Sequence, residues 1–338
     1  MTEAIGRPIQ ADSRPRLTEH HMQAPTEEPT PPIFKPEREE FNMPEASEGP
    51  TAVEPKLEKN NLQEAIEVRQ LVTISELERV QQLEKAIWNM KPIPIHHTLT
   101  AVKNGGIMIG AFHGENMVGF SYGFAGFHNG QSYLCSHMLG ILEDFRSHGI
   151  GAMLKEAQRQ AAIEKGYKMV TWTYDPLESA NAFLNLTKLK AICSTYIENC
   201  YGDMEDPLNR GLASDRFQVE WWIQSPHINE NDTDDWTAYK RIPYELTVDG
   251  EPIPLEVDAS FFNDQEAVLV PIPRHFQQLK KEHFELALDW RIKTRHIFQA
   301  LFTQGFAAMK LIKMNDEPVH YYVLKRRTTL RLESEDTK

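Results

Sequence analysis

The hydrophobic residues of the chain become periodic near Ala65, and from there they predict alternating strands and helices. Residues 65–73 alternate as in a strand, and residues 76–90, which Ser75 can cap, carry apolar side chains at helical spacing. Two apolar runs joined at residues 114–116 predict a hairpin over 106–127. Further strands are predicted over 132–142, 168–174 and 217–224, with helices from 150 to Gly166 and over 179–189. This order predicts a mixed sheet with helices on both faces.

The texture of the sequence changes near residue 226, after which an acidic polar connector precedes shorter elements. These are strands over 244–248, 267–273 and 319–326 and one long helix from about Phe276 to Gln304. One helix and a few short strands bury little apolar surface by themselves. We therefore expect residues 226–330 to be an extension packed on a core domain of residues 63–225, with a disordered end over 331–338.

Residues 1–62 have a different composition from the rest of the chain. They hold ten of its 21 prolines and twelve Asp or Glu against seven Lys or Arg, and no apolar period is visible. Such a segment cannot bury enough apolar surface to offset the entropy of ordering. We predict a disordered, Pro-rich acidic tail.

Composition and charge exclude several classes of function. The formal net charge of -13 argues against a protein that grips nucleic-acid phosphates, which requires Lys and Arg. The three cysteines form no C-x-x-C pair, so neither a disulfide framework nor a structural zinc site is expected, and no metal site is predicted. No apolar run is long enough to span a bilayer and no secretion signal is visible, so a cytoplasmic protein without membrane contact is expected.

The start of the helix after the 132–142 strand carries candidate chemistry. Two glycines one residue apart stand at its mouth, in the stretch Arg146, Ser147, His148, Gly149, Ile150 and Gly151. A helix start leaves backbone N–H groups without partners, and glycines there let those groups close around a phosphate. A dinucleotide fingerprint would need a third glycine where Leu154 stands, and a P-loop would need Lys and a hydroxyl after Gly151. The stretch therefore predicts a phosphate-binding site of another type.

In its strand context, this stretch resembles the pyrophosphate loop of the GNAT superfamily of acyl-CoA-dependent N-acyltransferases. The resemblance covers residues 65–224. Segments such as "WTYDPL", "DRFQVEWW" and "DWRIKTR" look like a subgroup of larger predicted acetyltransferases with a C-terminal extension. The resemblance implies an α/β (α+β) fold with a mixed, mostly antiparallel sheet, helices on both faces, splayed fourth and fifth strands, and a C-terminal α/β extension.

The resemblance also implies where acetyl-CoA or another acyl-CoA would bind. Leu139, Gly140 and Ile141 would hold the pantetheine arm, residues 146–151 would hold the pyrophosphate, and Asn181 would reach the coenzyme. A plain core strand is the alternative for residues 139–141.

Two positions depart from the superfamily pattern. Leu186 stands where a tyrosine often protonates the leaving thiolate, and Lys190 stands where glycine usually ends the helix. Tyr196 or Tyr201 could replace the missing acid, although buried structural tyrosines are common.

His137 is the candidate general base, because it lies on the fourth strand just before the splay and titrates in the right range. A satisfied core histidine is the alternative, and Glu143 is the fallback base. Arg291 and Arg295 share one helix face, and with Arg216 they could bind an acceptor carboxylate. The alternative for these arginines is a set of surface ion pairs in an acidic protein.

These features predict an N-acyltransferase that moves an acetyl or other short acyl group, succinyl included, to a small-molecule amine such as an amino acid. Transfer would be direct, in a ternary complex. Two alternatives stay open. One is a non-catalytic acyl-CoA sensor or scaffold, favoured by Leu186, and the other is acetylation of protein N-termini. The oligomeric state is not predictable from the sequence.

Overall fold

The computed structural model describes residues 65–128, 130–203, 210–230 and 234–332. All of them belong to one compact unit, Lys56–Lys338. The tail predicted over residues 1–62 and most of the end predicted over 331–338 lie outside the described residues.

The described chain combines strands with helices of 4 to 20 residues. The helices are α2 (Ile74–Trp88), α3 (Ile95–Lys103), α4 (Ile150–Glu164), α5 (Ser179–Ala182), α6 (Phe276–Glu282) and α7 (Phe284–Thr303), and a π-helix (Phe183–Lys188) directly follows α5. The strands are β1 (Ile66–Gln70), β2 (Ile107–His113), β3 (Asn116–His128), β4 (Gln131–Ile141), β5 (Val170–Tyr174), β6 (Ile192–Ile197), β7 (Arg216–Trp221), β8 (Lys240–Arg241), β9 (Tyr244–Leu246), β10 (Pro252–Pro254), β11 (Ala267–Pro273), β12 (Phe306–Ile312) and β13 (Val319–Arg326).

Eleven of these strands form one sheet, in the order β1-β2-β3-β4-β5-β7-β6-β12-β13-β11-β8, and β9 pairs only with β10. Among the described pairs, β4/β5 and β11/β8 are parallel and the others are antiparallel. The predicted mixed, mostly antiparallel sheet is therefore confirmed.

Helices cover both faces of the first half of the sheet. Successive residues of β2 point to opposite faces: Ile107 and Ile109 join the cluster that includes α4, whereas Met108 joins the cluster that includes α2 and α3. The amphipathic helix α2 begins two residues earlier than a cap at Ser75 predicts. Thr73 caps it, in a capping box with Glu76.

The segment after residue 226 continues the same sheet. Strand β12 lies beside β6, where Ala308 pairs with Cys193, and β13, β11 and β8 follow it outward. The long helix predicted over 276–304 is interrupted at His283, which ends α6 and begins α7. Helix α7 packs on β6, β11 and β12 through a buried stripe that includes Trp290, Phe298 and Leu301.

Candidate active site

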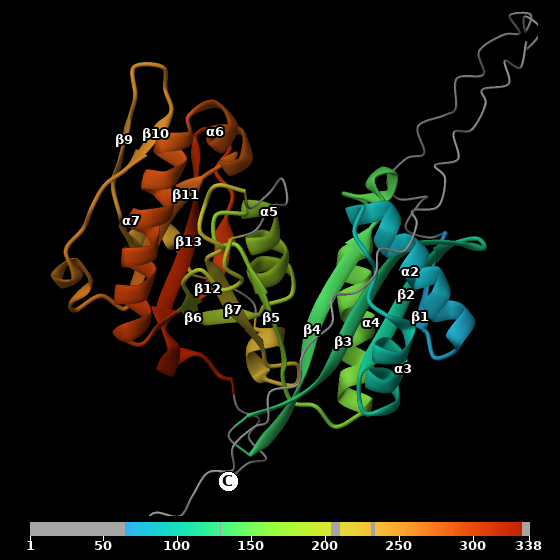
Figure 1. Ribbon diagram of the computed structural model, residues 1–338. Coiled ribbons are helices and arrows are strands. Elements are labelled where there is room, and N and C mark those ends of the chain that lie inside the picture. The colour runs from blue at the N-terminus through green and yellow to red at the C-terminus, as the bar shows by residue number, and fades with distance from the viewer. Residues whose placement is uncertain (1–64, 129, 204–209, 231–233, 333–338) are drawn as a thin grey trace, which may run out of the picture. The chain divides into compact units, whose positions relative to one another are not determined.

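The fourth and fifth strands pair over only two positions and then part, as the resemblance implies. Leu134 pairs with Val170 and Cys135 with Thr171, whereas β4 continues to Ile141 without further pairing to β5. Figure 1 shows the two strands diverging from this point. Beyond it lies a cavity of about 640 Å³ lined by both strands, by α4 and by the segment after β5.

The edge of β4 that faces the gap presents free backbone groups. The N–H of Leu142 donates to the Val118 carbonyl on β3 (3.0 Å), so Gly140, two residues back, also pairs with β3. The amides of Leu139 and Ile141 therefore point into the gap. Gly140 was expected to hold the pantetheine arm together with Leu139 and Ile141. Its backbone N–H and C=O groups instead face β3, away from the gap.

A β-bulge at His137 changes which side chains of β4 face each side of the sheet. Gly123 of β3 pairs with Ser136, but the preceding residue, Tyr122, pairs with Met138, so His137 is an extra residue. Before the bulge Ser136 faces α4, and after it Met138 packs with the cluster of α2 and α3. The bulge thus puts the side chains of Ser136 and Met138, which would share one face of a regular strand, on opposite faces of the sheet.

The mouth of α4 has the geometry of an anion site. Gly149 is its N-cap, with a φ of 80° and no side-chain cap, and Ser147 also has a positive φ of 65°. In the described chain, the N–H groups of Gly149, Ile150 and Gly151 donate to no protein acceptor. A Cβ on Gly151 would lie 3.5 Å from Ile141 Cδ1, facing the gap. Arg146 is exposed and donates from Nε to the Ile141 carbonyl at 3.2 Å.

The cavity is lined by hydroxyl, amide and basic side chains, and its lining in the described chain contains no Asp or Glu. Its charged residues are Lys155 and Arg216, together with the titratable His137. Asn181, predicted to reach the coenzyme, also lines it. This is a cation-rich hollow in an acidic chain.

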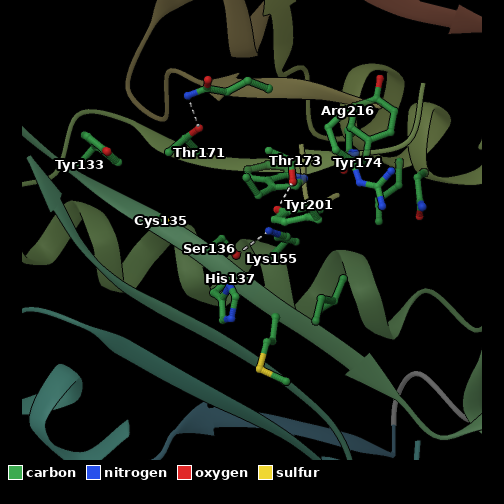
Figure 2. Close-up of a pocket in the computed structure, with 17 residues that line it drawn as sticks. Tyr133, Cys135, Ser136, His137, Lys155, Thr171, Thr173, Tyr174, Tyr201 and Arg216 are labelled. Carbon is green, nitrogen blue, oxygen red and sulfur yellow. Dashed lines mark hydrogen bonds between the residues drawn. The ribbon is translucent and has the colours of Figure 1, made fainter. Parts of the chain in front are cut away.

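Tyr201 stands at this cavity, whereas Tyr196 does not line it. The Tyr201 hydroxyl lies 2.7 Å from the Thr173 hydroxyl on β5, and the Arg216 guanidinium lies 5.4 Å from the Tyr201 ring centroid (Figure 2). The Tyr196 hydroxyl instead donates to buried Asp215 at 2.6 Å. Burial raises the pKa of Tyr196 far above its usual value. Of the two predicted acids, only Tyr201 is placed to reach a ligand in this cavity.

Leu186, at the place of the usual tyrosine, is fully buried in the core and does not line the cavity. Leu184 and Asn185 line the cavity from the wider turn of the π-helix. Lys190 adopts a positive φ of 57° at the place where glycine is usual, so the turn keeps its left-handed geometry with a lysine.

Lys155 is a site residue that the sequence analysis missed. Its side chain is 3% exposed, and its Nζ donates to the Ser136 hydroxyl at 2.7 Å and lies 3.6 Å from the centroid of the Trp172 ring. Figure 2 shows this contact at the narrow end of the parted strands. Burial lowers the pKa of the Lys155 amine to about 7. The sequence alone suggests a solvent-exposed helix lysine. The burial of Lys155 could not be predicted, because it results from the position of the side chain between the parted strands β4 and β5.

A second hollow, of about 600 Å³, lies on the face that carries α3. Its lining includes His96, His97 and Asn104 from α3 and the end of that helix, and Tyr122 and His137 from the sheet. His137 lines both hollows, and its ring packs near the rings of Tyr122 and Phe124. Burial among them lowers its pKa, so the neutral imidazole prevails at pH 7. Glu143, the fallback base, is exposed and lines neither hollow.

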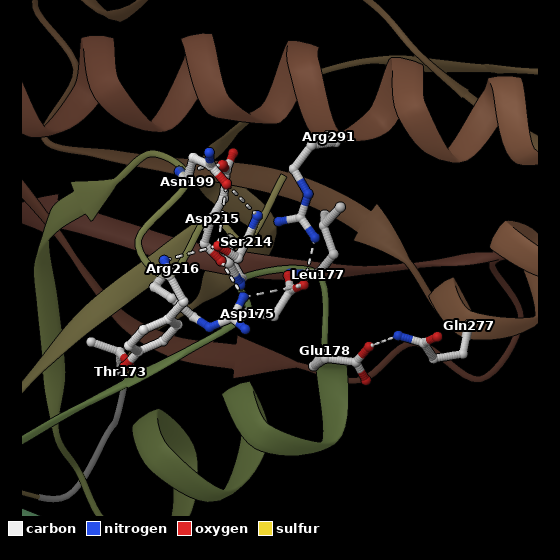
Figure 3. A network of polar contacts seen from close by, with 12 residues as sticks. Thr173, Asp175, Leu177, Glu178, Asn199, Ser214, Asp215, Arg216, Gln277 and Arg291 are labelled. Atoms are coloured by element: carbon white, nitrogen blue, oxygen red, sulfur yellow. Dashed lines mark hydrogen bonds and ion pairs between the residues drawn. The ribbon is translucent and has the colours of Figure 1, made fainter. Parts of the chain in front are cut away.

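The three predicted acceptor arginines belong to a polar network between the end of β5, β7 and α7. Figure 3 shows Arg216 and Arg291 in this network. Asp215, fully buried, accepts from Arg295 Nε (2.8 Å) and Nη2 (3.1 Å). Arg291, 2% exposed, donates to Asp175 at 2.5 Å. Arg291 and Arg295 thus already pair with carboxylates of the chain, although these ion pairs are buried rather than on the surface as the alternative expected. Arg216 lies 3.9 Å from Asp175 and also borders the cavity.

The described residues show neither a metal-binding cluster nor a membrane-spanning helix. They contain no cluster of three or more His, Cys, Asp or Glu arranged to hold a metal ion. None of their helices combines the length and apolar character needed to cross a membrane.

No protein-family model matches the chain, and no curated protein matches it. Several solved structures resemble part of it, among them acetyltransferases of the GNAT family. A GNAT-family acetyltransferase from Streptococcus pneumoniae is 13% identical and covers 46% of this chain and 98% of its own, with a TM-score of 0.38. NAA60 of Arabidopsis thaliana, solved with a bisubstrate analogue, is 16% identical over 46% of this chain and 98% of its own (TM-score 0.37). An aminoglycoside acetyltransferase from an uncultured soil metagenomic sample is 19% identical over 36% of this chain and 84% of its own (TM-score 0.32). At these values, the likenesses do not by themselves assign the chain to a family.

Proposed function

We propose that the protein is an acyl-CoA-dependent N-acyltransferase whose acceptor is a small-molecule amine. One observation carries the proposal: strands β4 and β5 pair at two positions and then part around a cavity. The uncapped mouth of α4 does not line this cavity but adjoins two residues that do, because a Cβ on Gly151 would lie 3.8 Å from Leu139 and 3.9 Å from Leu184. An extended polar arm ending in a diphosphate fits both parts of this site.

The residues present fit the coenzyme. The backbone groups of Leu139 and Ile141 would pair with the amides of the arm as a neighbouring strand does. The free N–H groups of residues 149–151, at the positive end of the α4 dipole, would hold the diphosphate. Asn181 would contact the coenzyme from the far side of the cavity.

The hollow beside α3 would admit the acceptor from the opposite face of the sheet. His137 borders both hollows, so its neutral imidazole would accept a proton from the amine while the amine lies in line with the thioester carbonyl. Tyr201, held by Thr173, would donate a proton to the leaving thiolate. These roles support direct transfer without an acyl-enzyme.

Thiol release from acetyl-CoA and succinyl-CoA with a panel of amines and peptides tests the proposal. Release that depends on a small amine is the expected result. Binding of coenzyme without release on any acceptor would replace the enzyme with an acyl-CoA sensor or scaffold. Faster release with peptides than with free amino acids would move the acceptor to protein N-termini, and absence of coenzyme binding would overturn the site itself.

A further inference from the structure

Lys155 is a buried amine whose observed partners are neutral. The ammonium has three N–H donors, and one of them is taken by the Ser136 hydroxyl. The face of Trp172 stabilises the charge without neutralising it. Among the described residues, no Asp or Glu forms an ion pair with Lys155. A buried charge is costly unless it is paired, so this position lacks a compensating anion.

The position of the amine is defined by the parting of the strands. Cys135 and Thr171 are the last paired residues, and Ser136 and Trp172, the next residue on each strand, are the two that contact Lys155 Nζ. The amine therefore lies at the closed end of the gap. The mouth of α4 lies near Ile141. Ile141 is five residues beyond Ser136, so the two residues are roughly 16 Å apart along β4, at about 3.3 Å per residue.

This separation means that one anion cannot serve both ends. A diphosphate at the mouth of α4 would be held by the backbone amides there, whereas the arm would run along β4 toward Lys155. The group at the end of that arm is the acyl group. A neutral acetyl group would offer no anionic partner to the protonated Lys155 amine, and the described lining of the cavity has no carboxylate to do so.

Resting on the proposed acyl transfer, we propose that the transferred acyl group ends in a carboxylate, as in the thioester of a short dicarboxylic acid, and that Lys155 pairs with that carboxylate. Lys155 and Ser136 lie on the α4 side of the sheet, whereas the acceptor hollow on the α3 side is not lined by Lys155. The ion pair thus selects the acyl donor rather than the amine.

Calorimetric titration with acetyl-CoA, succinyl-CoA and the methyl ester of succinyl-CoA tests this inference. The wild-type protein is expected to bind succinyl-CoA at least tenfold more tightly than either neutral donor. Lys155→Met, which keeps side-chain length and removes the charge, is expected to abolish the difference. Lys165→Met, an exposed lysine just after α4, is the matched control and is expected to keep it.

The outcomes separate the inference from the proposed function. Equal affinity of the wild-type protein for all three donors would overturn the acidic acyl group and leave the acyltransferase standing. Tight binding of the methyl ester would also overturn the acidic acyl group, because the site would then select the acyl group by its size rather than by its charge. Failure of every donor to bind would remove the proposed function first. The wild-type comparison needs no variant, so it remains decisive if Lys155→Met folds poorly.

Discussion

The amine of Lys155 on α4 lies 2.7 Å from the hydroxyl of Ser136 on β4, and the Ser136 hydroxyl in turn donates to Gln158 Oε1, also at 2.7 Å. All three side chains are buried, and the Nε2 of Gln158 makes no hydrogen bond in the described chain. A buried lysine held only by neutral partners should burden the folded state at low pH.

The pH dependence of stability should therefore reveal Lys155. Because burial lowers its folded pKa to about 7, the unfolded chain binds more protons than the folded chain between about pH 7 and the usual lysine value. The Lys155 contribution to stability is then most unfavourable below pH 7 and is relieved as the pH rises. Lys155→Met should gain stability over wild type near pH 6 and lose about 3 kcal/mol of that gain near pH 9, at about 1.4 kcal/mol per pH unit above the folded pKa.

Urea unfolding of both proteins at the two pH values measures this difference. The nearest titratable group, Cys135, is present in both, so its contribution largely cancels. Lys165→Met is the control and should show no such change. A constant difference between Lys155→Met and wild type across this range would contradict a buried, depressed amine.

Gly151→Val should weaken coenzyme A binding at least tenfold, because a branched side chain there projects toward Ile141 and into the gap. Valine at Gly149 would be a poorer test, since the φ of 80° strains any branched residue by about 1–3 kcal/mol. In a helix, valine is better tolerated than glycine, so the fold should not weaken.

Calorimetry gives the affinity of each variant, and urea unfolding gives its stability. Gly151→Ala, whose Cβ makes only ordinary contacts, is the matched control and should bind more tightly than the valine variant. Unchanged affinity in Gly151→Val would remove the arm from the gap.

His137→Gln should lower kcat/KM for the amine about 100-fold while the dissociation constant of coenzyme A stays the same. Burial lowers the pKa of His137, so the activity it supports should fall only as the pH drops below the usual histidine value near 6.5. A pH–rate profile checks both points, with exposed His128→Gln as control. A low-pH limb that survives in His137→Gln would assign the base elsewhere.

Tyr201→Phe should lower kcat about 100-fold without weakening coenzyme binding, because it removes only the hydroxyl that Thr173 positions. The matched control is Tyr196→Phe, which should cost roughly 1–3 kcal/mol of stability because buried Asp215 loses a hydrogen bond. Steady-state kinetics and urea unfolding separate the two. If kcat falls in Tyr196→Phe and not in Tyr201→Phe, the acid has been assigned to the wrong tyrosine.

Arg295→Met should act on stability rather than on acceptor binding. It leaves Asp215 buried without its bidentate partner, a loss of about 3–5 kcal/mol for a broken buried pair. Arg241→Met breaks a half-exposed pair with Glu317 and should cost under about 1 kcal/mol. A raised KM for the amine with unchanged stability in Arg295→Met would restore the predicted acceptor role.

The sequence predicted the elements with strong periods and missed those whose signal is weak or tertiary. The hairpin, β4, α4 and β5 follow from clear alternation or helical spacing, and the parting of β4 and β5 followed from the resemblance. Helix α3 was missed because it has nine residues and no side-chain cap, and β12 was missed because its alternation is short.

Site residues divide in the same way. The mouth of α4 could be predicted because backbone geometry there depends on glycine. Gly151, Lys155 and Gln158 lie at helical spacing and therefore on one face of α4. The sequence alone does not distinguish this polar face, which is buried beside the cavity, from a face exposed to solvent. The partners of Arg291 and Arg295 lie more than seventy residues away in the sequence, so only the fold pairs them.

The continuous sheet also determines where other molecules can attach by strand addition. In the described chain its outermost strands are β1 and the two-residue β8, whose Lys240 and Arg241 are the kind of charged, abbreviated border that discourages such pairing. Both walls of the gap are interior strands, covered on their far sides by β3 and β7. Any assembly formed by extending the sheet would therefore leave the dimensions of the reaction chamber unchanged.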